Sequence, residues 1–234
     1  MKAKIAIERY DKNHILLERR EQPCRSFTIN MIKLLYAGAA NLNCEVETIA
    51  ATDITNTSRN LSRYHQSSDH APDGSLRLAA PGGDGACQIL GMGDYRTAYG
   101  DNYYYTRQID GYSIGIVLGT GSGAVAPTDY QVTQIAHGIS AGEIQYGGSE
   151  VGPLTVSAPS ATIDLRRYFT NVSGGDITVN EVGIYTSGAV FIMQGSYLGF
   201  TANSFCIARD LVSPAVVVPT TEILRVIYTL SITV

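Results

Sequence analysis

The chain has 234 residues and a formal net charge of −4, and 44% of its residues are hydrophobic while only 16% are charged. A chain of this length buries about 70% of its unfolded surface, as one large β domain or two small ones, so this composition excludes a disordered protein. The negative net charge argues against binding driven by nucleic-acid phosphates, and we expect no nucleic-acid partner.

The charge is divided unevenly along the sequence. Residues 1–35 hold eight basic and four acidic side chains (+4), and the rest hold nine and seventeen (−8). These opposite charges either steer docking between protomers or hold the N-terminal segment on the body of the same monomer, and both alternatives stay open. The basic side chains of this candidate docking segment are Lys2, Lys4, Arg9, Lys12, Arg19 and Arg20.

The cysteines Cys24, Cys44, Cys87 and Cys206 form no C-x-x-C pair. Their spacing predicts neither a zinc site nor a disulfide framework, and we expect reduced, buried thiols in a protein made in the host cytoplasm. No segment has the pattern of a secretory signal, and no window approaches the roughly 18 apolar residues of a membrane helix. The sequence therefore predicts no membrane partner.

The N-terminal segment predicts a hairpin followed by one helix. Lys4–Tyr10 alternates with period two, Asp11–Asn13 offers turn chemistry, and His14–Arg20 pairs back on the first strand. Ser26 is the expected N-cap of a helix of about twelve residues that stops near Gly38. The apolar residues expected on one face of this helix are Phe27, Met31, Leu34 and Leu35.

A second strand region is predicted near Cys44–Ala51, and the polar residues that follow predict an extended arm or loop. The expected organisation has three parts: an N-terminal hairpin, helix and docking segment over 1–51, the arm over 52–74, and a β-sandwich domain over 75–234.

From Ser75 onward, short apolar runs alternate with turn signals at a spacing of roughly ten residues. This spacing predicts a mainly β fold, an antiparallel β-sandwich or jelly-roll-like domain. The candidate strands are Leu76–Ala80, Cys87–Met92, Ser113–Gly119, Glu143–Tyr146, Val151–Val156, Ala161–Phe169, Ile177–Tyr185, Val190–Gln194, Phe205–Ala208 and Ile223–Val234. The prolines Pro127, Pro153, Pro159, Pro214 and Pro219 are expected between strands.

The last strand is expected at the centre of the sandwich, because its alternate residues form an apolar face. That face comprises Leu224, Val226, Tyr228, Leu230, Ile232 and Val234, and the opposite face is more polar.

Five tyrosines gather in one short segment: Tyr95, Tyr99, Tyr103, Tyr104 and Tyr105. Because tyrosine buries a large, rigid, amphipathic ring at low entropic cost, this segment predicts a contact loop for a neighbouring subunit or a host surface glycan. The alternative is a loop folded over the open end of the sandwich.

Patterns that would indicate an enzyme are weak. Gly119–Gly123 lacks the lysine and spacing of a phosphate loop, so a turn is expected there. His65, Asp69 and His70 could supply three metal ligands, but they lie in a polar loop, and His137 near Glu143 is expected in a turn. A carboxylate pair such as Asp164 and Glu181 comes from strands that the sequence cannot bring together. We therefore predict no enzyme and no catalytic, cofactor-binding or metal residues.

Three motifs in the second half of the chain stand in a characteristic order. Gly115–Tyr130 carries a "GTG" turn and a Pro-Thr-Asp segment, Ile177–Tyr185 ends in "EVGIY", and Cys206–Pro214 contains "IAR" before the last strand. This order resembles a pattern in tailed-bacteriophage structural proteins, notably the N-terminal β domain of tail-collar fibres. The resemblance covers roughly residues 113–234.

The resemblance implies a non-enzymatic structural component of a virion, with other copies of itself and other virion proteins as partners. No shaft or receptor-binding tip follows the domain, which favours a compact part at the neck, tail or fibre-attachment region. The alternatives are a capsid surface decoration protein and a carbohydrate-binding or receptor-binding module, although the absence of tryptophan argues against a sugar-stacking platform.

Overall fold

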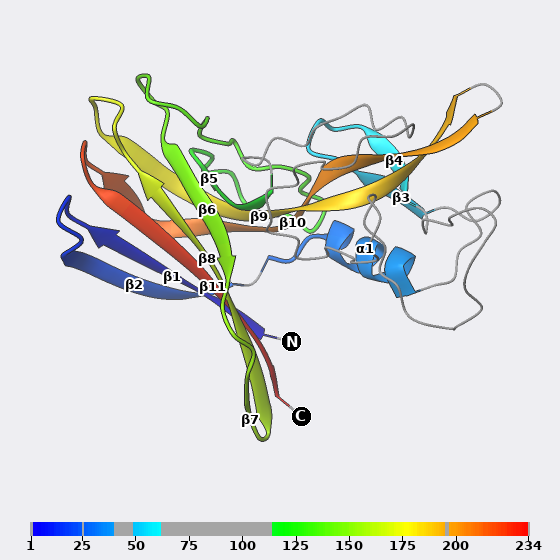
Figure 1. Ribbon diagram of the computed structural model, residues 1–234, viewed down its shortest axis with the longest axis horizontal. Helices are drawn as coiled ribbons and strands as arrows, with labels where there is room; N and C mark the ends of the chain where they lie inside the picture. Colours follow the sequence, from blue (N-terminus) through cyan, green and yellow to red (C-terminus); the bar gives the residue numbers. More distant parts are fainter. Residues whose placement is uncertain (1, 25, 40–48, 62–113, 195–196, 234) are drawn as a thin grey trace, which may run out of the picture.

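The chain folds as two antiparallel β-sheets packed on each other, with one helix in the described part (Figure 1). The structure, a computed structural model, describes residues 2–24, 26–39, 49–61, 114–194 and 197–233. The predicted mainly β fold with antiparallel packed sheets is therefore confirmed. Two candidate strands, Leu76–Ala80 and Cys87–Met92, lie outside the described residues.

Sheet A contains both ends of the described chain. In spatial order it contains β2 (Leu16–Cys24), β1 (Lys2–Tyr10), β11 (Ile223–Thr233), β8 (Ser160–Thr170) and β6 (Gln145–Val151), with β7 (Thr155–Ser157) paired to β8. The predicted pairing of the first two strands is present, but their hairpin is not an appendage, because β1 also pairs with β11 along its whole length.

Sheet B is built on two long strands. In order it contains β10 (Tyr197–Val218), β9 (Ile177–Gln194), β4 (Ser58–Leu61) and β3 (Ile49–Thr52), with β5 (Gly115–Gly119) paired to β9. The predicted break between Tyr185 and Val190 is wrong, because the β9–β10 ladder continues through Gly188, which pairs with Asn203. A glycine weakens a strand without always ending it, and here the pairing of β9 with β10 continues across Gly188.

Pro214 was expected between strands, and the structure places it inside β10. It lies where the β9–β10 register shifts between Leu211 and Val216. Since proline cannot donate to the ladder, a bulge is one of the few strand positions that accepts it.

Buried side chains of the two sheets meet in one core. β11 lies between β1 and β8, and its residues Leu224, Val226, Tyr228 and Leu230 are buried as predicted. Ile232 lies on the same face, as predicted, but is 54% exposed because β11 continues beyond the sandwich, and Val234 lies outside the described residues.

Arg167 joins the sheets from the inner face of β8. Its Nη1 donates to the carbonyls of Ile114 (2.8 Å) and Ile116 (3.1 Å), beside and within β5. Its guanidinium carbon lies 4.8 Å from the centre of the Tyr146 ring, whose hydroxyl donates to Ile135 O at 2.7 Å. A buried cation is tolerated here because carbonyls and an aromatic face surround it.

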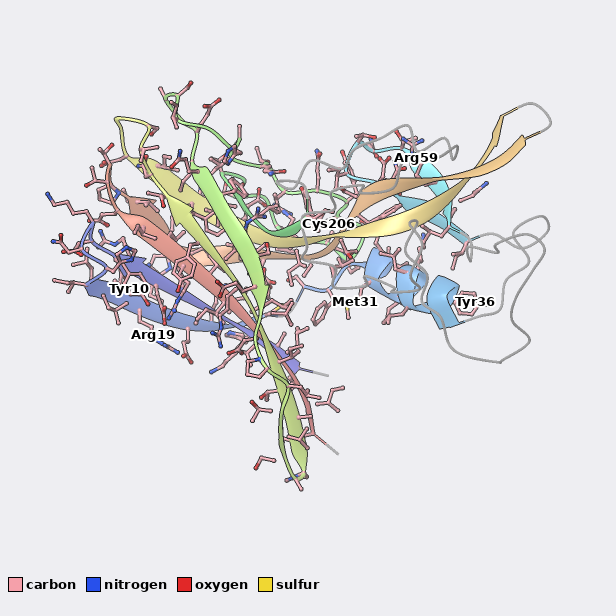
Figure 2. The ribbon with its side chains drawn as sticks, viewed as in Figure 1. Tyr10, Arg19, Met31, Tyr36, Arg59 and Cys206 are labelled. Atoms are coloured by element: carbon pink, nitrogen blue, oxygen red, sulfur yellow. The ribbon has the colours of Figure 1, made fainter. Side chains whose placement is uncertain are left out.

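The helix α1 (Ile29–Ala39) begins three residues after the expected N-cap. Ser26 is not the cap: its carbonyl accepts the Arg209 amide, and the adjacent Phe27 forms a bridge to Ala208 of β10. Pairing with β10 keeps this segment extended, which excludes a helical start there. Of the predicted apolar face, the helix buries Met31 and Leu34, whereas Leu35 is partly exposed and Phe27 precedes the helix; Figure 2 labels Met31.

The polar residues 52–74 were predicted as an arm or loop, but the part that the structure describes forms a hairpin. Thr52 of β3 pairs with Ser58 of β4. The turn closes on the buried Asp53 carboxylate, which accepts hydrogen bonds from the Thr55 and Thr57 amides and from Arg59 Nε (2.7 Å). The prediction failed because this strand has no apolar alternation, and side-chain capping of the turn favours the hairpin instead.

One end of sheet A projects away from the sandwich as a narrow tongue, at the bottom of Figure 1. We define the tongue as residues 151–163 together with the end of β11 from Leu230 onward. In the tongue, Val156 of β7 pairs with Ala161 of β8, which pairs in turn with Ile232 of β11.

Candidate functional site

Two polar centres stand out, one buried between loop and sheet and one on the outer face of sheet A. The buried centre is an ion-pair cluster around Arg209 of β10. Its Nε donates to Glu181 Oε2 at 2.6 Å, and its Nη1 donates to Asp129 Oδ2 at 2.8 Å. Burial alone would lower the pKa of Arg209, but the hydrogen bonds to the two carboxylates raise it above its ordinary value. Arg209 therefore keeps its charge.

The glycine-rich segment Gly119–Gly123 is hydrogen-bonded to the same cluster. The amides of Gly121 (3.0 Å) and Thr133 (2.6 Å) donate to Glu181 Oε1, and Arg209 Nη2 donates to Gly123 O at 3.1 Å. A Cβ at Gly119 would lie 2.6 Å from Glu181 Oε1, so this segment needs glycine for close approach. The hairpin turn expected at Gly119–Gly123 is not present: Gly119 ends β5, residues 120–122 are irregular, and Gly123 is a bend.

The rest of the "EVGIY" motif packs against the same loop. A Cβ at Gly183 would lie 2.8 Å from a methyl group of Val132, and the Val132 amide donates to the Tyr185 hydroxyl at 2.8 Å. Burial raises the pKa of Tyr185, so the phenol stays protonated. The motifs that carry the family resemblance thus meet at one place in the fold.

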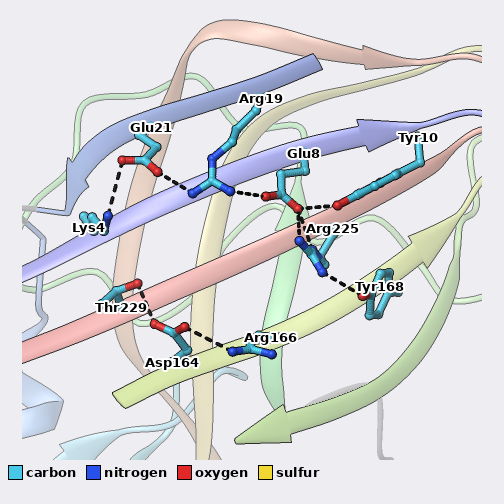
Figure 3. A network of polar contacts seen from close by, with 10 residues as sticks. All are labelled: Lys4, Glu8, Tyr10, Arg19, Glu21, Asp164, Arg166, Tyr168, Arg225 and Thr229. Carbon is cyan, nitrogen blue, oxygen red and sulfur yellow. Dashed lines mark hydrogen bonds and ion pairs between the residues drawn. The ribbon is translucent and has the colours of Figure 1, made fainter. Parts of the chain in front are cut away.

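The second centre is a hollow of about 370 Å³ on the outer face of sheet A (Figure 3). Side chains from four neighbouring strands surround it, because alternate residues of each strand point to the same face. The lining residues are Lys4, Ala6, Arg19, Asp164, Arg166, Arg225, Ile227 and Thr229.

The Glu8 carboxylate lies beside this hollow and contacts three other side chains. Although it is only 1% exposed, its carboxylate accepts hydrogen bonds from Tyr10 Oη (2.6 Å), Arg19 Nη1 (2.6 Å) and Arg225 Nε (2.5 Å). Burial and the hydrogen bond to Glu8 raise the pKa of Tyr10. A buried carboxylate needs such partners to stay ionised.

Arg225 lies between two aromatic rings, with its guanidinium carbon 5.5 Å from the ring centres of both Tyr10 and Tyr168. It also donates to the Tyr168 hydroxyl at 2.9 Å. Further along the sheet, Asp164 accepts from Thr229 (2.7 Å) and from Arg166 (3.2 Å). These contacts, of which the Asp164–Arg166 pair lies within β8 and the others join β8 to β11, fix the side chains in place on the sheet surface.

The hollow holds charges of both signs, and its cations already contact carboxylates of the same chain. The hydroxyl of Thr229 donates a hydrogen bond to the Asp164 carboxylate. The hollow could therefore recognise a ligand through ionic contacts and hydrogen bonds. Asp164 and Glu181 do not form a carboxylate pair, because Asp164 lies on the outer face of sheet A while Glu181 is buried in sheet B.

Four of the six basic residues predicted as a docking segment form ion pairs within the chain. Lys4 pairs with Glu21, Arg9 with Glu222, Arg19 with Glu8, and Arg20 with Glu18. Three of these pairs lie within residues 1–35, and only Arg9–Glu222 joins a basic residue of this segment to an acidic residue of the rest of the chain. The alternative in which the charge split holds the N-terminal segment on the body therefore also stays a prediction. Docking through this segment stays a prediction.

Lys2 and Lys12 are exposed, at opposite ends of β1. A test of docking requires substitutions at these two lysines, because removal of residues 1–20 would delete β1, which lies between β2 and β11 in sheet A.

The predicted contact loop of Tyr95, Tyr99, Tyr103, Tyr104 and Tyr105 lies outside the described residues, as do His65, Asp69 and His70. Of the cysteines, Cys24 and Cys206 are free and buried as predicted, and burial raises the pKa of both thiols. Cys44 and Cys87 lie outside the described residues.

His137 and Glu143 hold a turn. His137 Nδ1 accepts the Tyr146 amide at 3.0 Å, and Glu143 accepts the Ser140 amide at 2.9 Å. Within the described part of the chain, no group of three or more His, Cys, Asp and Glu side chains could hold a metal ion. Nor does that part contain a helix long and apolar enough to span a membrane.

The sequence did not single out Glu8, Arg225 or Arg209 as members of polar centres. A signal was present for the outer face, because Arg225, Ile227 and Thr229 were recognised as the more polar face of the last strand. For the cluster around Arg209, the three sequence motifs contain the residues involved but do not predict which of them contact each other.

Comparisons with models of protein families, with curated proteins and with solved structures found no match to this chain.

Proposed function

We propose that this protein is a non-enzymatic structural component of a tailed-phage virion, which assembles by subunit docking at the neck, tail or fibre-attachment region. The observation that carries the proposal is the convergence of the three resembling motifs on the Arg209–Glu181 cluster. Glu181 comes from "EVGIY", Arg209 from "IAR", and Asp129 from the Pro-Thr-Asp segment.

This convergence gives the resemblance a physical basis. The motif residues are those whose chemistry the fold requires: a buried ion pair, glycines in close approach and a buried phenol. Similar motifs in phage structural proteins would build the same loop and sheet, so the likeness concerns the scaffold. The low content of charged residues supports a protein with much of its surface covered by neighbours.

The experiment is to measure the copy number per purified particle of the phage that encodes the chain, by quantitative mass spectrometry against the major capsid protein. We expect on the order of six to eighteen copies for a ring at the neck or tail. Hundreds of copies would assign the chain to capsid decoration instead, and absence from particles would overturn a structural role in the virion.

A further inference from the structure

The hollow on the outer face of sheet A follows from the strand register. Ala6 of β1 pairs with Ile227 of β11, which pairs in turn with Arg166 of β8. Lys4 and Glu8 lie two residues to either side of Ala6, so their longer side chains stand on the same face as its methyl group. Ala6 (4% exposed) and Ile227 (8%) form a nearly covered apolar floor, and longer polar side chains form the walls.

Positive charge dominates the lining of the hollow. Four of the lining side chains are cations: Lys4, Arg19, Arg166 and Arg225. Asp164 also lines the hollow, and Glu8 and Glu21 pair with three of the cations from beside it. Counted together, four positive and three negative charges leave this part of the sheet at +1, although the whole chain carries −4. The hollow therefore favours an anion.

Two of the cations are held firmly, and a third is not. Arg19 and Arg225 both donate to the buried Glu8 carboxylate, at 2.6 Å and 2.5 Å. The Lys4–Glu21 pair is longer, at 3.3 Å, and its side chains are 51% and 42% exposed. Exposed pairs of this kind contribute little to stability, so Lys4 can turn to a ligand without losing a strong contact.

Arg166 has the fewest partners of the four cations. A guanidinium carries five N–H groups, but in the described part of the chain Arg166 donates one hydrogen bond, from Nη2 to Asp164 at 3.2 Å. Its buried Nε has no partner there. Asp164 also accepts the Thr229 hydroxyl, and it gives Arg166 a single contact where a guanidinium pairs best with a carboxylate through two. Arg166 therefore has unused donors beside the hollow.

We propose that the hollow binds one carboxylate group. Lys4 and Arg166, on either side of β11, hold the group, and the guanidinium of Arg225 adds a fixed positive charge (Figure 3). A carboxylate matches the fork of a guanidinium, and its single charge balances the +1 of the hollow. A doubly charged phosphate fits less well, because Asp164 in the lining repels further negative charge.

Two sources offer this group, an acidic side chain of a partner protein and a free small carboxylic acid. The chemistry that the hollow recognises is the same for both. The site goes beyond the proposed function and does not depend on it, since binding to the isolated chain and presence in virions are measured separately.

The test titrates the isotope-labelled full chain with sodium acetate, which replaces sodium chloride at constant ionic strength so that screening does not change. The NMR signal of each arginine Nε–H reports the contacts of its guanidinium. We expect the Arg166 signal to shift and saturate with a Kd of about 1–10 mM, as suits a ligand of so few atoms. Arg59 is the internal control, because it pairs with Asp53 beside sheet B. A shift without saturation, or an equal shift at Arg59, would overturn the site.

Variants locate the binding. Arg166→Gln and Lys4→Gln should each weaken acetate binding at least about fivefold, read from the Arg225 signal. Lys12→Gln is the matched control, since it removes the same charge from an exposed turn outside the hollow and should change the Kd less than about twofold. The melting temperature checks that each variant is folded. Unchanged affinity in both hollow variants would contradict the proposal.

Asp164→Asn tests the proposal in the opposite direction. The substitution keeps the shape of the side chain but removes the carboxylate that competes for Arg166, so acetate should bind about fivefold more tightly. A side chain with a purely structural role would not produce this gain. Affinity equal to or below that of the wild type in a folded Asp164→Asn variant would overturn the site.

Two further ligands distinguish the sources. A capped Gly-Glu-Gly peptide carries the carboxylate on a side chain, and a capped Gly-Gln-Gly peptide is its uncharged control. Tighter binding of the glutamate peptide than of acetate assigns the site to an acidic side chain of a partner protein, whereas acetate binding at least as tight assigns it to a free small acid. Either result supports the carboxylate site, and phosphate binding more tightly than both would overturn it.

Discussion

Arg209 and Glu181 form an ion pair across β10 and β9, with 2.6 Å between Arg209 Nε and Glu181 Oε2. Glu181 is fully buried and Arg209 nearly so. The β9 and β10 backbones are already hydrogen-bonded to each other, and the pair adds contacts to a third segment. The second carboxylate oxygen of Glu181 accepts hydrogen bonds from the amides of Gly121 and Thr133. The ion pair therefore fixes the loop that crosses the edge of sheet B.

Glu181→Gln should destabilise the protein strongly. The substitution leaves a buried guanidinium with only Asp129 as its anionic partner, and breaking a buried pair in this way costs about 3 kcal/mol or more. The matched control is Glu18→Gln, which removes a partly exposed partner of Arg20 and should cost less than about 1 kcal/mol. Urea unfolding measures the free energy of unfolding of both variants. Equal losses would show that the buried pair stabilises the protein no more than the partly exposed one.

The glycines of the "GTG" turn should differ in their tolerance of alanine. At Gly119 a Cβ would lie 2.8 Å from Thr133 O as well as against Glu181, so Gly119→Ala should cost about 1–3 kcal/mol. Gly123 has nothing within 4 Å of its ideal Cβ, and Gly123→Ala should change stability by less than about 0.5 kcal/mol. Thermal unfolding of the two variants compares them, and a sensitive Gly123 with a tolerant Gly119 would contradict the loop geometry.

Asp53 should make stability depend on pH in the acid range. Its burial would raise its pKa, but hydrogen bonds from Thr55, Arg59 and Thr57 lower it from 3.8 to about 2. Because the folded pKa is depressed, the stabilisation is complete above pH 4 and is lost as the pH falls toward 2. A shift of this size corresponds to about 2 kcal/mol.

Asp53→Asn should therefore lose about 2 kcal/mol at pH 7 and little at pH 2, as measured by urea unfolding at both values. Asp11→Asn is the control, since Asp11 accepts hydrogen bonds in a similar turn but is only partly buried, and this variant should lose less. A pH-independent difference between wild type and Asp53→Asn would exclude the ionised carboxylate as the cause.

Deletion of the last ten residues should abolish soluble folding. The deletion removes nearly all of β11, which lies between β1 and β8 and buries Val226, Tyr228 and Leu230. Ile232→Thr, at an exposed position of the same strand, should leave a folded protein with an unchanged circular dichroism spectrum. Soluble, folded protein after the deletion would show that β11 is dispensable.

The sequence was sufficient where a periodic pattern acts locally. The alternation in Lys4–Tyr10 and in Leu224–Leu230 predicted both strands, and for the latter also the buried face. It failed at Ser58–Leu61, a strand without apolar alternation, and at β9, whose length depends on its partner strand rather than on its own residues.

The sequence did not predict the contacts in the two polar centres, for a related reason. Glu181 and Arg209 are 28 positions apart, and Asp129 lies 80 positions before Arg209. Ion pairs at such separations follow from sheet register, and register depends on the whole pairing pattern. The motifs identified which residues the loop needs, but only the fold shows that one carboxylate serves both the turn and the arginine.

The pairing of β1 with β11 has a consequence for biosynthesis. Glu8 and Arg225, which contact each other in sheet A, are 217 positions apart, so a ribosome makes the first strand long before its neighbour exists. Until then the apolar side chains Ile5 and Ile7 lack the sheet that buries them in the native state. Such long-range pairing slows folding and leaves strand edges open to aggregation until the partner strand is made, so we expect sheet A to close late.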